Sequence, residues 1–173
     1  MTAVEINQAL QQAVASCAAT ARQYEETVFL RQAHERWSRA EHLIHLTKVA
    51  SSVCKALQMP ASMLQSTFGA VQHTTRPYDE IVEHYDTALK GDFVRALPFC
   101  TFQTDTDTQD SVLLGFVQQH EILGQLLLQR TEEELDACQI PHPAMGNLTL
   151  REFYYFLIYH IGHHQRGIEQ VAF

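Results

Sequence analysis

The chain has 173 residues, a net charge of −8 and an ordinary apolar content, so residues 1–173 can form one domain with a hydrophobic core. Its lysines and arginines are scattered and form no basic block, which argues against a nucleic-acid-binding protein. No stretch approaches the roughly 20 apolar residues of a membrane span, and the N-terminus has no basic segment followed by an apolar run. These features predict a protein of the cytoplasm that does not act at a membrane.

The first half of the chain contains two long amphipathic patterns. Apolar residues at helical spacing predict a helix over 3–22, and residues 23–36 are interpreted as a connection. Ser38 followed three residues later by Glu41 is a capping box, and it opens a second helix over 38–57. Glu41 lies one turn before a histidine, but we interpret it as the capping residue.

The middle of the chain predicts two more helices separated by polar loops. Residues 60–76 have a mixed composition, after which Pro77 suits the first turn of a helix over 77–90. Residues 97–110 are rich in Thr and Asp and are predicted to form a loop that borders the functional site. A fourth long helix follows over about 110–130.

The last part of the chain predicts a loop and a final helix. Residues 140–148 contain Pro and Gly and are interpreted as a loop, a second candidate wall for a site. Thr149 and Glu152 form another capping box, which opens a helix over 149–171. We find no strand signal of any length and no internal repeat.

Long amphipathic helices joined by loops predict an all-α fold. The expected architecture is an antiparallel four-helix bundle with one or two additional short helices. Bundles of this size often pair through an exposed helix face, so the sequence is compatible with a homodimer.

The cysteines do not point to a thiolate metal site. They are far apart and include no C-x-x-C pair, so the sequence contains neither a zinc-thiolate motif nor a redox motif. The four positions are Cys17, Cys54, Cys100 and Cys138. Histidine is the unusual residue, because ten in a chain of this length is a high count.

Two of these histidines share the apolar stripe of the last helix. The stripe steps by three and four residues through positions 150, 153, 157, 160, 164, 168 and 171. His160 and His164 therefore point the same way, one turn apart, and can bind one metal ion. The alternative is a pair of hydrogen-bonded core histidines. His163 lies about 100° around the helix from His164 and is interpreted as a flanking residue.

A third ligand should come from a facing helix, because bundles build metal sites in this way. The second helix offers His42 and His45, and the fourth offers His120. Periodicity favours His120, which lies in the middle of its stripe, and it places His42 nearer the stripe of the second helix than His45. The spacing alone therefore leaves the third ligand open.

Two segments resemble a known family. Residues 37–46, WSRAEHLIHL, resemble the W-S-x-x-E-x-x-x-H-L segment of the DinB-like superfamily. Residues 142–152, HPAMGNLTLRE, followed by the histidines at 160, 163 and 164, resemble the second segment of that family. The superfamily includes YfiT-type metal-dependent hydrolases and bacillithiol transferases, and its members are four-helix bundles.

The resemblance implies a metal site made of His45, His160 and His164. In the family, one histidine of the second helix and an H-x-x-x-H pair on the last helix bind a divalent ion. Many members continue the last histidine as H-R-G-Q, whereas this chain has Gln165 at that point and shifts Arg-Gly by one residue. A role that the Arg or Gln of H-R-G-Q has beside the site in those members therefore cannot be carried over to this chain.

Three imidazoles with open coordination positions are typical of a catalytic metal centre, and they suit Zn, Ni, Fe(II) or Cu. The resemblance implies an enzyme that acts on a small molecule, either a hydrolase or a thiol S-transferase with a thiol substrate. Two alternatives stay open. One is a non-catalytic bundle that binds a metal or a small molecule, and the other is a bundle whose histidines are structural.

Overall fold

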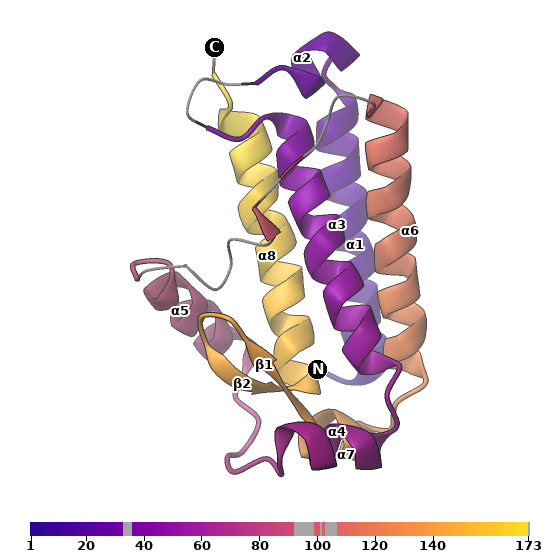
Figure 1. Ribbon diagram of the computed structural model, residues 1–173, viewed down its shortest axis with the longest axis vertical. Coiled ribbons are helices and arrows are strands. Elements are labelled where there is room, and N and C mark those ends of the chain that lie inside the picture. The colour runs from indigo at the N-terminus through magenta and orange to yellow at the C-terminus, as the bar shows by residue number, and fades with distance from the viewer. Residues whose placement is uncertain (33–35, 92–98, 101, 103–106, 173) are drawn as a thin grey trace.

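Four long helices form the centre of the fold in the computed structural model, which describes residues 1–32, 36–91, 99–100, 102 and 107–172 (Figure 1). They are α1 (Ala3–Arg22), α3 (Arg39–Leu57), α6 (Gln109–Leu128) and α8 (Leu150–Gln170). Each begins at a capping box in which a Ser or Thr hydroxyl accepts a hydrogen bond from the third residue of the helix. These boxes pair backbone N–H groups that the first turn leaves free, which is why the predicted starts lie so close to the observed ones.

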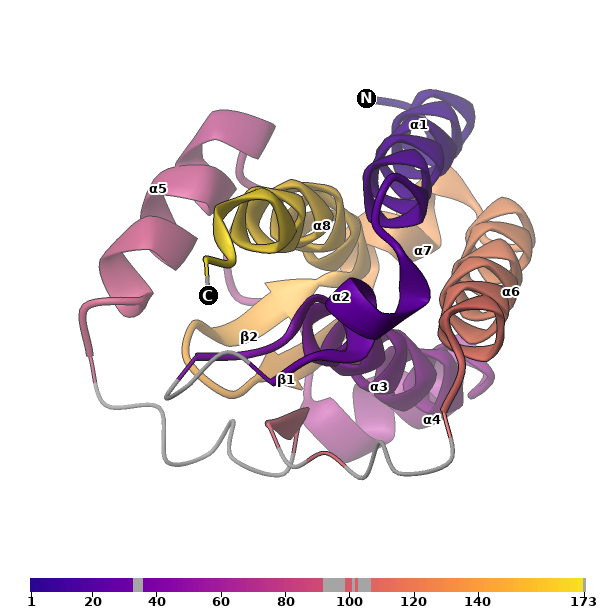
Figure 2. The ribbon, with the colours of Figure 1, turned by 90° about the horizontal axis from the view of Figure 1, so that it is seen from above.

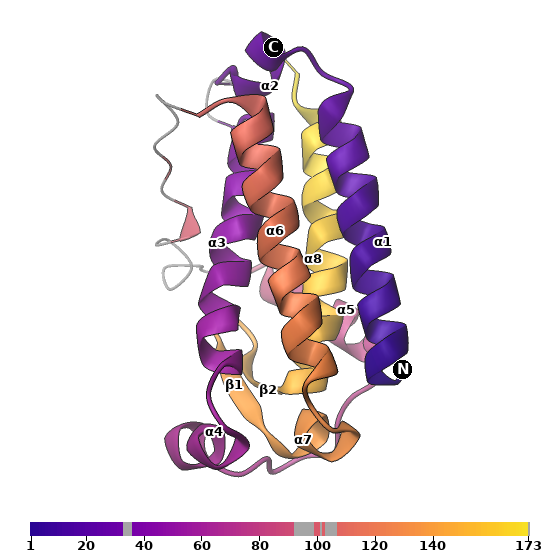
Figure 3. The ribbon, with the colours of Figure 1, turned by 90° about the vertical axis from the view of Figure 1, so that its right-hand side faces the viewer.

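The four helices pack in the order α1, α6, α3, α8 around a shared core (Figure 2). The side chain of Gln109, at the start of α6, donates to the carbonyl of Ala21 near the end of α1, so these two helices are antiparallel. Arg130, just after α6, donates to the carbonyl of Leu57 at the end of α3. Helices α3 and α6 therefore run in the same direction (Figure 3). The bundle is all-α as predicted, but its helix directions do not simply alternate. The chain returns from the end of α3 to the end of the bundle where α3 began before it starts α6.

Shorter helices connect or flank the bundle. Those in the described residues are α2 (Glu26–Leu30), α4 (Ala61–Phe68), α5 (Tyr78–Ala88) and α7 (Glu132–Ala137). Helix α5 matches the predicted helix over 77–90. Helices α2 and α4 correct the interpretation of 23–36 as a plain connection and of 60–76 as mixed. Each has a single buried residue, Phe29 or Leu64, and such a short helix offers too few buried positions for a periodic pattern.

A small antiparallel hairpin corrects the prediction that the chain contains no strand. Strands β1 (Gln139–His142) and β2 (Gly146–Thr149) pair with Ile140 opposite Leu148. Gly146 has a φ of 73°, a conformation that glycine adopts without strain, and it closes the turn. Strands of four residues are too short to show an alternating pattern, which is why the sequence of 140–148 indicates a loop.

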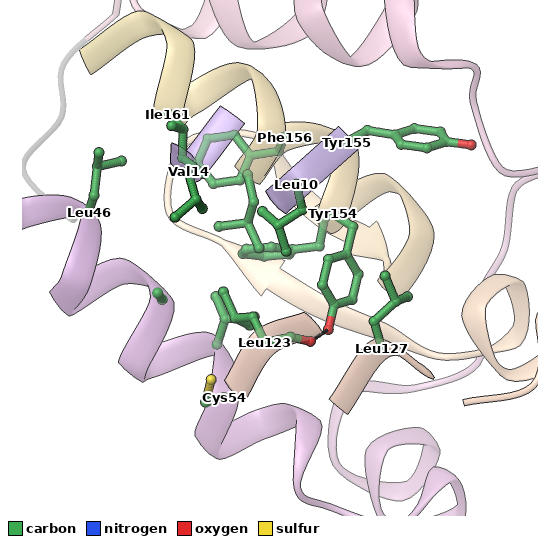
Figure 4. Close-up of a cluster of buried hydrophobic side chains, with 14 of the residues drawn as sticks. Leu10, Val14, Leu46, Cys54, Leu123, Leu127, Tyr154, Tyr155, Phe156 and Ile161 are labelled. Carbon is green, nitrogen blue, oxygen red and sulfur yellow. Dashed lines mark hydrogen bonds between the residues drawn. The ribbon is translucent and has the colours of Figure 1, made fainter. Parts of the chain in front are cut away.

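The core is built from the inner faces of the four long helices (Figure 4). Leu10 of α1, Leu46 of α3 and Leu123 of α6 are buried and belong to the same hydrophobic cluster as aromatic side chains of α8. The hydroxyl of Tyr154 donates to the carbonyl of Leu123 at 2.8 Å, which pairs the one polar atom of a large buried ring. Within the described part of the chain, no helix is long and apolar enough to cross a membrane.

Candidate metal centre

The structure brings His45 of α3 together with His160 and His164 of α8. The Nε2 atom of His160 lies 3.3 Å from Nε2 of His45 and 2.9 Å from Nε2 of His164. One ring nitrogen from each histidine lies within 4.8 Å of the other two, and all three side chains are buried. The three residues are called the triad below.

The local sequence explains why two triad members face inward. Every position of the predicted stripe on α8, from 150 to 171, is buried, and His160 and His164 occupy two of them. His45 lies at the edge of the α3 stripe, beside the buried Leu46. That edge faces α8, so the packing of α3 against α8 buries a side chain that periodicity alone did not select.

Hydrogen bonds outside the triad orient two of its rings. Nδ1 of His45 lies 3.0 Å from the carbonyl oxygen of Phe99. A carbonyl can only accept, so this Nδ1 carries the hydrogen, and Nε2 of His45 presents a lone pair to the triad. Nδ1 of His164 lies 2.9 Å from Nδ1 of His42, so the Nε2 atom of His164 is left facing His160.

Burial keeps the triad neutral. Loss of solvent lowers the pKa of His45, and it lowers the pKa of His160 and of His164 well below the usual value of a histidine. A neutral imidazole carries one hydrogen, so each triad ring with its hydrogen on Nδ1 turns an Nε2 lone pair toward the other two rings. Nδ1 of His160 is buried and has no hydrogen-bond partner among the described residues. A cation between the Nε2 atoms would bind such lone pairs and offset the repulsion between them.

Two of the three separations between the triad Nε2 atoms fit a bound divalent ion. With metal–nitrogen bonds of about 2.0–2.1 Å, two ligand nitrogens are about 2.9 Å apart at a right angle and about 3.4 Å apart in a tetrahedron. The observed separations of 2.9 and 3.3 Å are close to these values. The donor set is three neutral imidazoles, which suits Zn, Ni, Fe(II) or Cu.

Aromatic side chains hold the triad rings from outside. The ring of Trp37 stacks on His164, with centroids 5.5 Å apart and planes at 7°. The ring of Phe156 stacks on His160, with centroids 4.8 Å apart and planes at 24°. The loss of either ring would free an imidazole to rotate, so these contacts keep the ligand nitrogens aligned.

Gly167 makes room for His42. A Cβ atom at position 167 would lie 2.5 Å from Cε1 of His42, which is closer than any real contact. The imidazole of His42 can therefore reach His164 only because residue 167 has no side chain. No sequence pattern signals this role, since the contact joins α3 to α8 and depends on the distance between these helices.

The other candidate histidines lie outside the triad. His42 contacts the triad at Nδ1 of His164 and lines the cavity next to it. His120 is buried, and its Nδ1 donates to the carbonyl of Phe116 at 2.7 Å. His163 is half-buried and lines the cavity next to the triad, as expected of a flanking residue. Gln165 donates instead to the hydroxyl of Thr20, away from the imidazoles.

A cavity of about 690 Å³ borders the triad. Its described walls come from α3, α4, α5, α8 and the hairpin, and the hairpin contributes Ile140 to Ala144. The predicted wall over 140–148 therefore lies at the cavity, although as a hairpin. Phe99 and Cys100, from the predicted loop over 97–110, also line it, while residues 97–98, 101 and 103–106 of that loop lie outside the described residues.

Comparison with known proteins gives one match. A family model described as the DinB superfamily matches residues 5–168, a range that includes all three triad histidines. A search of curated proteins and a search of solved structures each gave no match.

Proposed function

The chain belongs to the DinB superfamily, and from this premise we propose that it is a metal-dependent enzyme that binds one divalent ion through His45, His160 and His164. The observation that carries the proposal is the meeting of three Nε2 atoms at the wall of a cavity. Three protein ligands leave a tetrahedral or larger coordination shell incomplete, as in catalytic rather than structural sites. The cavity supplies space for a substrate on that open side.

The reaction class favoured by the walls is thiol S-transfer. A bound divalent ion would lower the pKa of a coordinated thiol or water and so supply a nucleophile at neutral pH. Hydrolysis usually also needs a base to manage the proton of the water. No Asp or Glu occurs among the described residues that line the cavity, so a base for the water would have to be a histidine such as His142 or His163. A thiol needs less help, because its own pKa is much lower than that of water.

The residues around the triad would position the metal ligands and would not themselves react with the substrate. Phe99 and His42 hold the Nδ1 sides of two triad rings, and Trp37 and Phe156 hold the ring planes. Such groups keep ligand nitrogens in place before the ion arrives and make the neutral imidazoles better ligands. The resemblance to YfiT-type proteins, in particular to bacillithiol transferases, supports the same choice of reaction.

The test is turnover by protein loaded with Zn, Ni or Fe(II). Consumption of a thiol with an alkylating electrophile and hydrolysis of an ester should be measured in parallel for wild type, His160→Ala and Gln165→Ala. Gln165 is the matched control, because it neighbours His164 but bonds to Thr20. We expect metal-dependent thiol transfer in wild type and Gln165→Ala and its loss in His160→Ala.

Other outcomes separate the alternatives. Ester hydrolysis without thiol transfer would assign the site to a hydrolase. Stoichiometric metal without turnover of any substrate would support a non-catalytic metal-binding protein. A rate that is equal in His160→Ala and wild type would remove the triad from catalysis.

A further inference from the structure

The cavity beside the triad has apolar walls along most of its length. Helix α3 contributes Val49, Val53 and Ala56 to it, and α8 contributes the rings of Phe153 and Phe156. Tyr85 and Leu89 close the side next to α5. Helix α5 and the hairpin lie on the same side of the bundle, next to α8 (Figure 1). A ligand in this space would therefore meet mainly carbon atoms.

The lining extends well beyond the triad. His45 and Ala56 both line the cavity and are eleven residues apart on α3, which corresponds to about 16 Å at 1.5 Å per residue. The volume of about 690 Å³ lies within the range of sites that enclose a whole small organic molecule. A metal-bound atom would fill only the triad end, so the remainder must accommodate the body of the ligand.

The described walls of the cavity contain few groups that could pair with a charged ligand. Among the described residues that line the cavity, Lys55 is the one side chain with a permanent charge, and it lies on the exposed side of α3. A thiol that carries several carboxylates would leave them without partners against apolar walls, which is costly. An uncharged apolar body would instead gain from leaving water.

We infer that the cavity binds an uncharged organic molecule with an apolar body of alkyl or aromatic character, placed with its sulfur at the triad. The inference names the substrate class of the proposed enzyme. It rests on the proposed function for the position of the sulfur, whereas the affinity of the cavity for the apolar body does not depend on a metal.

The first experiment therefore uses metal-free protein and the uncharged fluorophore N-phenyl-1-naphthylamine, displaced by n-alkanols from butanol to octanol. Each added methylene should strengthen displacement by about fourfold, since the burial of one methylene contributes about that factor. Ala56→Trp fills the cavity from α3 and should weaken dye binding at least tenfold. Ala19→Trp makes the same substitution on an exposed site of α1 and should leave binding unchanged.

A second variant keeps the test decisive if Ala56→Trp does not fold. Val49→Asp places a carboxylate in a half-buried part of the wall and should also weaken dye binding while the helical circular dichroism signal stays intact. Absence of saturable dye binding to the folded wild type, or alkanol affinities that do not depend on chain length, would overturn the inference. So would equal binding by Ala56→Trp and Ala19→Trp.

A second arm tests the sulfur end with cobalt-loaded protein, titrated with butanethiol and with mercaptosuccinate. The thiolate charge-transfer band should saturate at a concentration of butanethiol at least tenfold lower than that of mercaptosuccinate. Tighter binding of mercaptosuccinate would overturn the assignment of an uncharged substrate. Failure to bind cobalt, with dye binding retained, would refute the proposed metal site while the apolar cavity stands.

Discussion

Substitution of Gly167 by Ala should weaken metal binding without touching a ligand. The new Cβ would lie 2.5 Å from Cε1 of His42, and an ordinary contact begins at 3.4 Å, so the imidazole must retreat by about 0.9 Å. A shift of that size breaks the 2.9 Å contact between His42 and His164. Outer partners of ligand histidines typically contribute 10- to 100-fold in metal affinity, so we expect a loss of about that size.

Gly162 provides the matched control on the same helix. A Cβ at that position would have its nearest neighbour, Nη1 of Arg166, at 3.7 Å, which is an ordinary contact. Gly162→Ala should therefore keep the metal affinity of wild type and raise the free energy of unfolding by about 0.5–1 kcal/mol, because alanine favours the helix. Zinc affinity should be measured by competition with a chromogenic chelator. Wild-type affinity in Gly167→Ala, or an equal loss in Gly162→Ala, would refute the reasoning.

Two further predictions concern buried ionisable groups. Burial lowers the pKa of His120 to about 4, so the unfolded chain binds an extra proton between about pH 6.5 and pH 4. The free energy of unfolding of metal-free protein, measured in urea, should therefore decrease as the pH falls through that window. The prediction is wrong if this free energy depends on pH as steeply in His120→Gln as in wild type. Glu152 is buried and accepts hydrogen bonds from the side chain and backbone of Arg76. Glu152→Gln should cost about 2–4 kcal/mol, and a cost no larger than that of exposed Glu133→Gln would contradict it.

The long helices could be predicted from the sequence because their ends carry their own signals. Thr149 and Glu152 mark the start of α8 by a local hydrogen-bond exchange that depends on no distant residue. The hairpin could not be predicted, since its four-residue strands gain their burial from α4 and α8 rather than from an alternating pattern. The direction of α6 depends on how far the chain travels between helices, and composition does not encode that distance.

The residues of the site also fall into those that the sequence predicts and those that it does not. His160 and His164 could be paired from the sequence, because one helix fixes the spacing of residues four apart. The choice among His42, His45 and His120 depends on where α3 and α6 approach α8, and only the resemblance to the family indicated His45. Gly167 could not be assigned a role, since its contact with His42 exists only once two helices are packed.

The claim that the triad holds a metal ion is tested most directly by elemental analysis of purified protein, with His160→Ala measured beside wild type. We predict about one equivalent of Zn, Ni or Fe in wild type after incubation with these ions and its loss in His160→Ala, because the Nε2 atom of His160 lies between those of His45 and His164. No metal in either protein would mean that the three imidazoles are structural and would contradict the account.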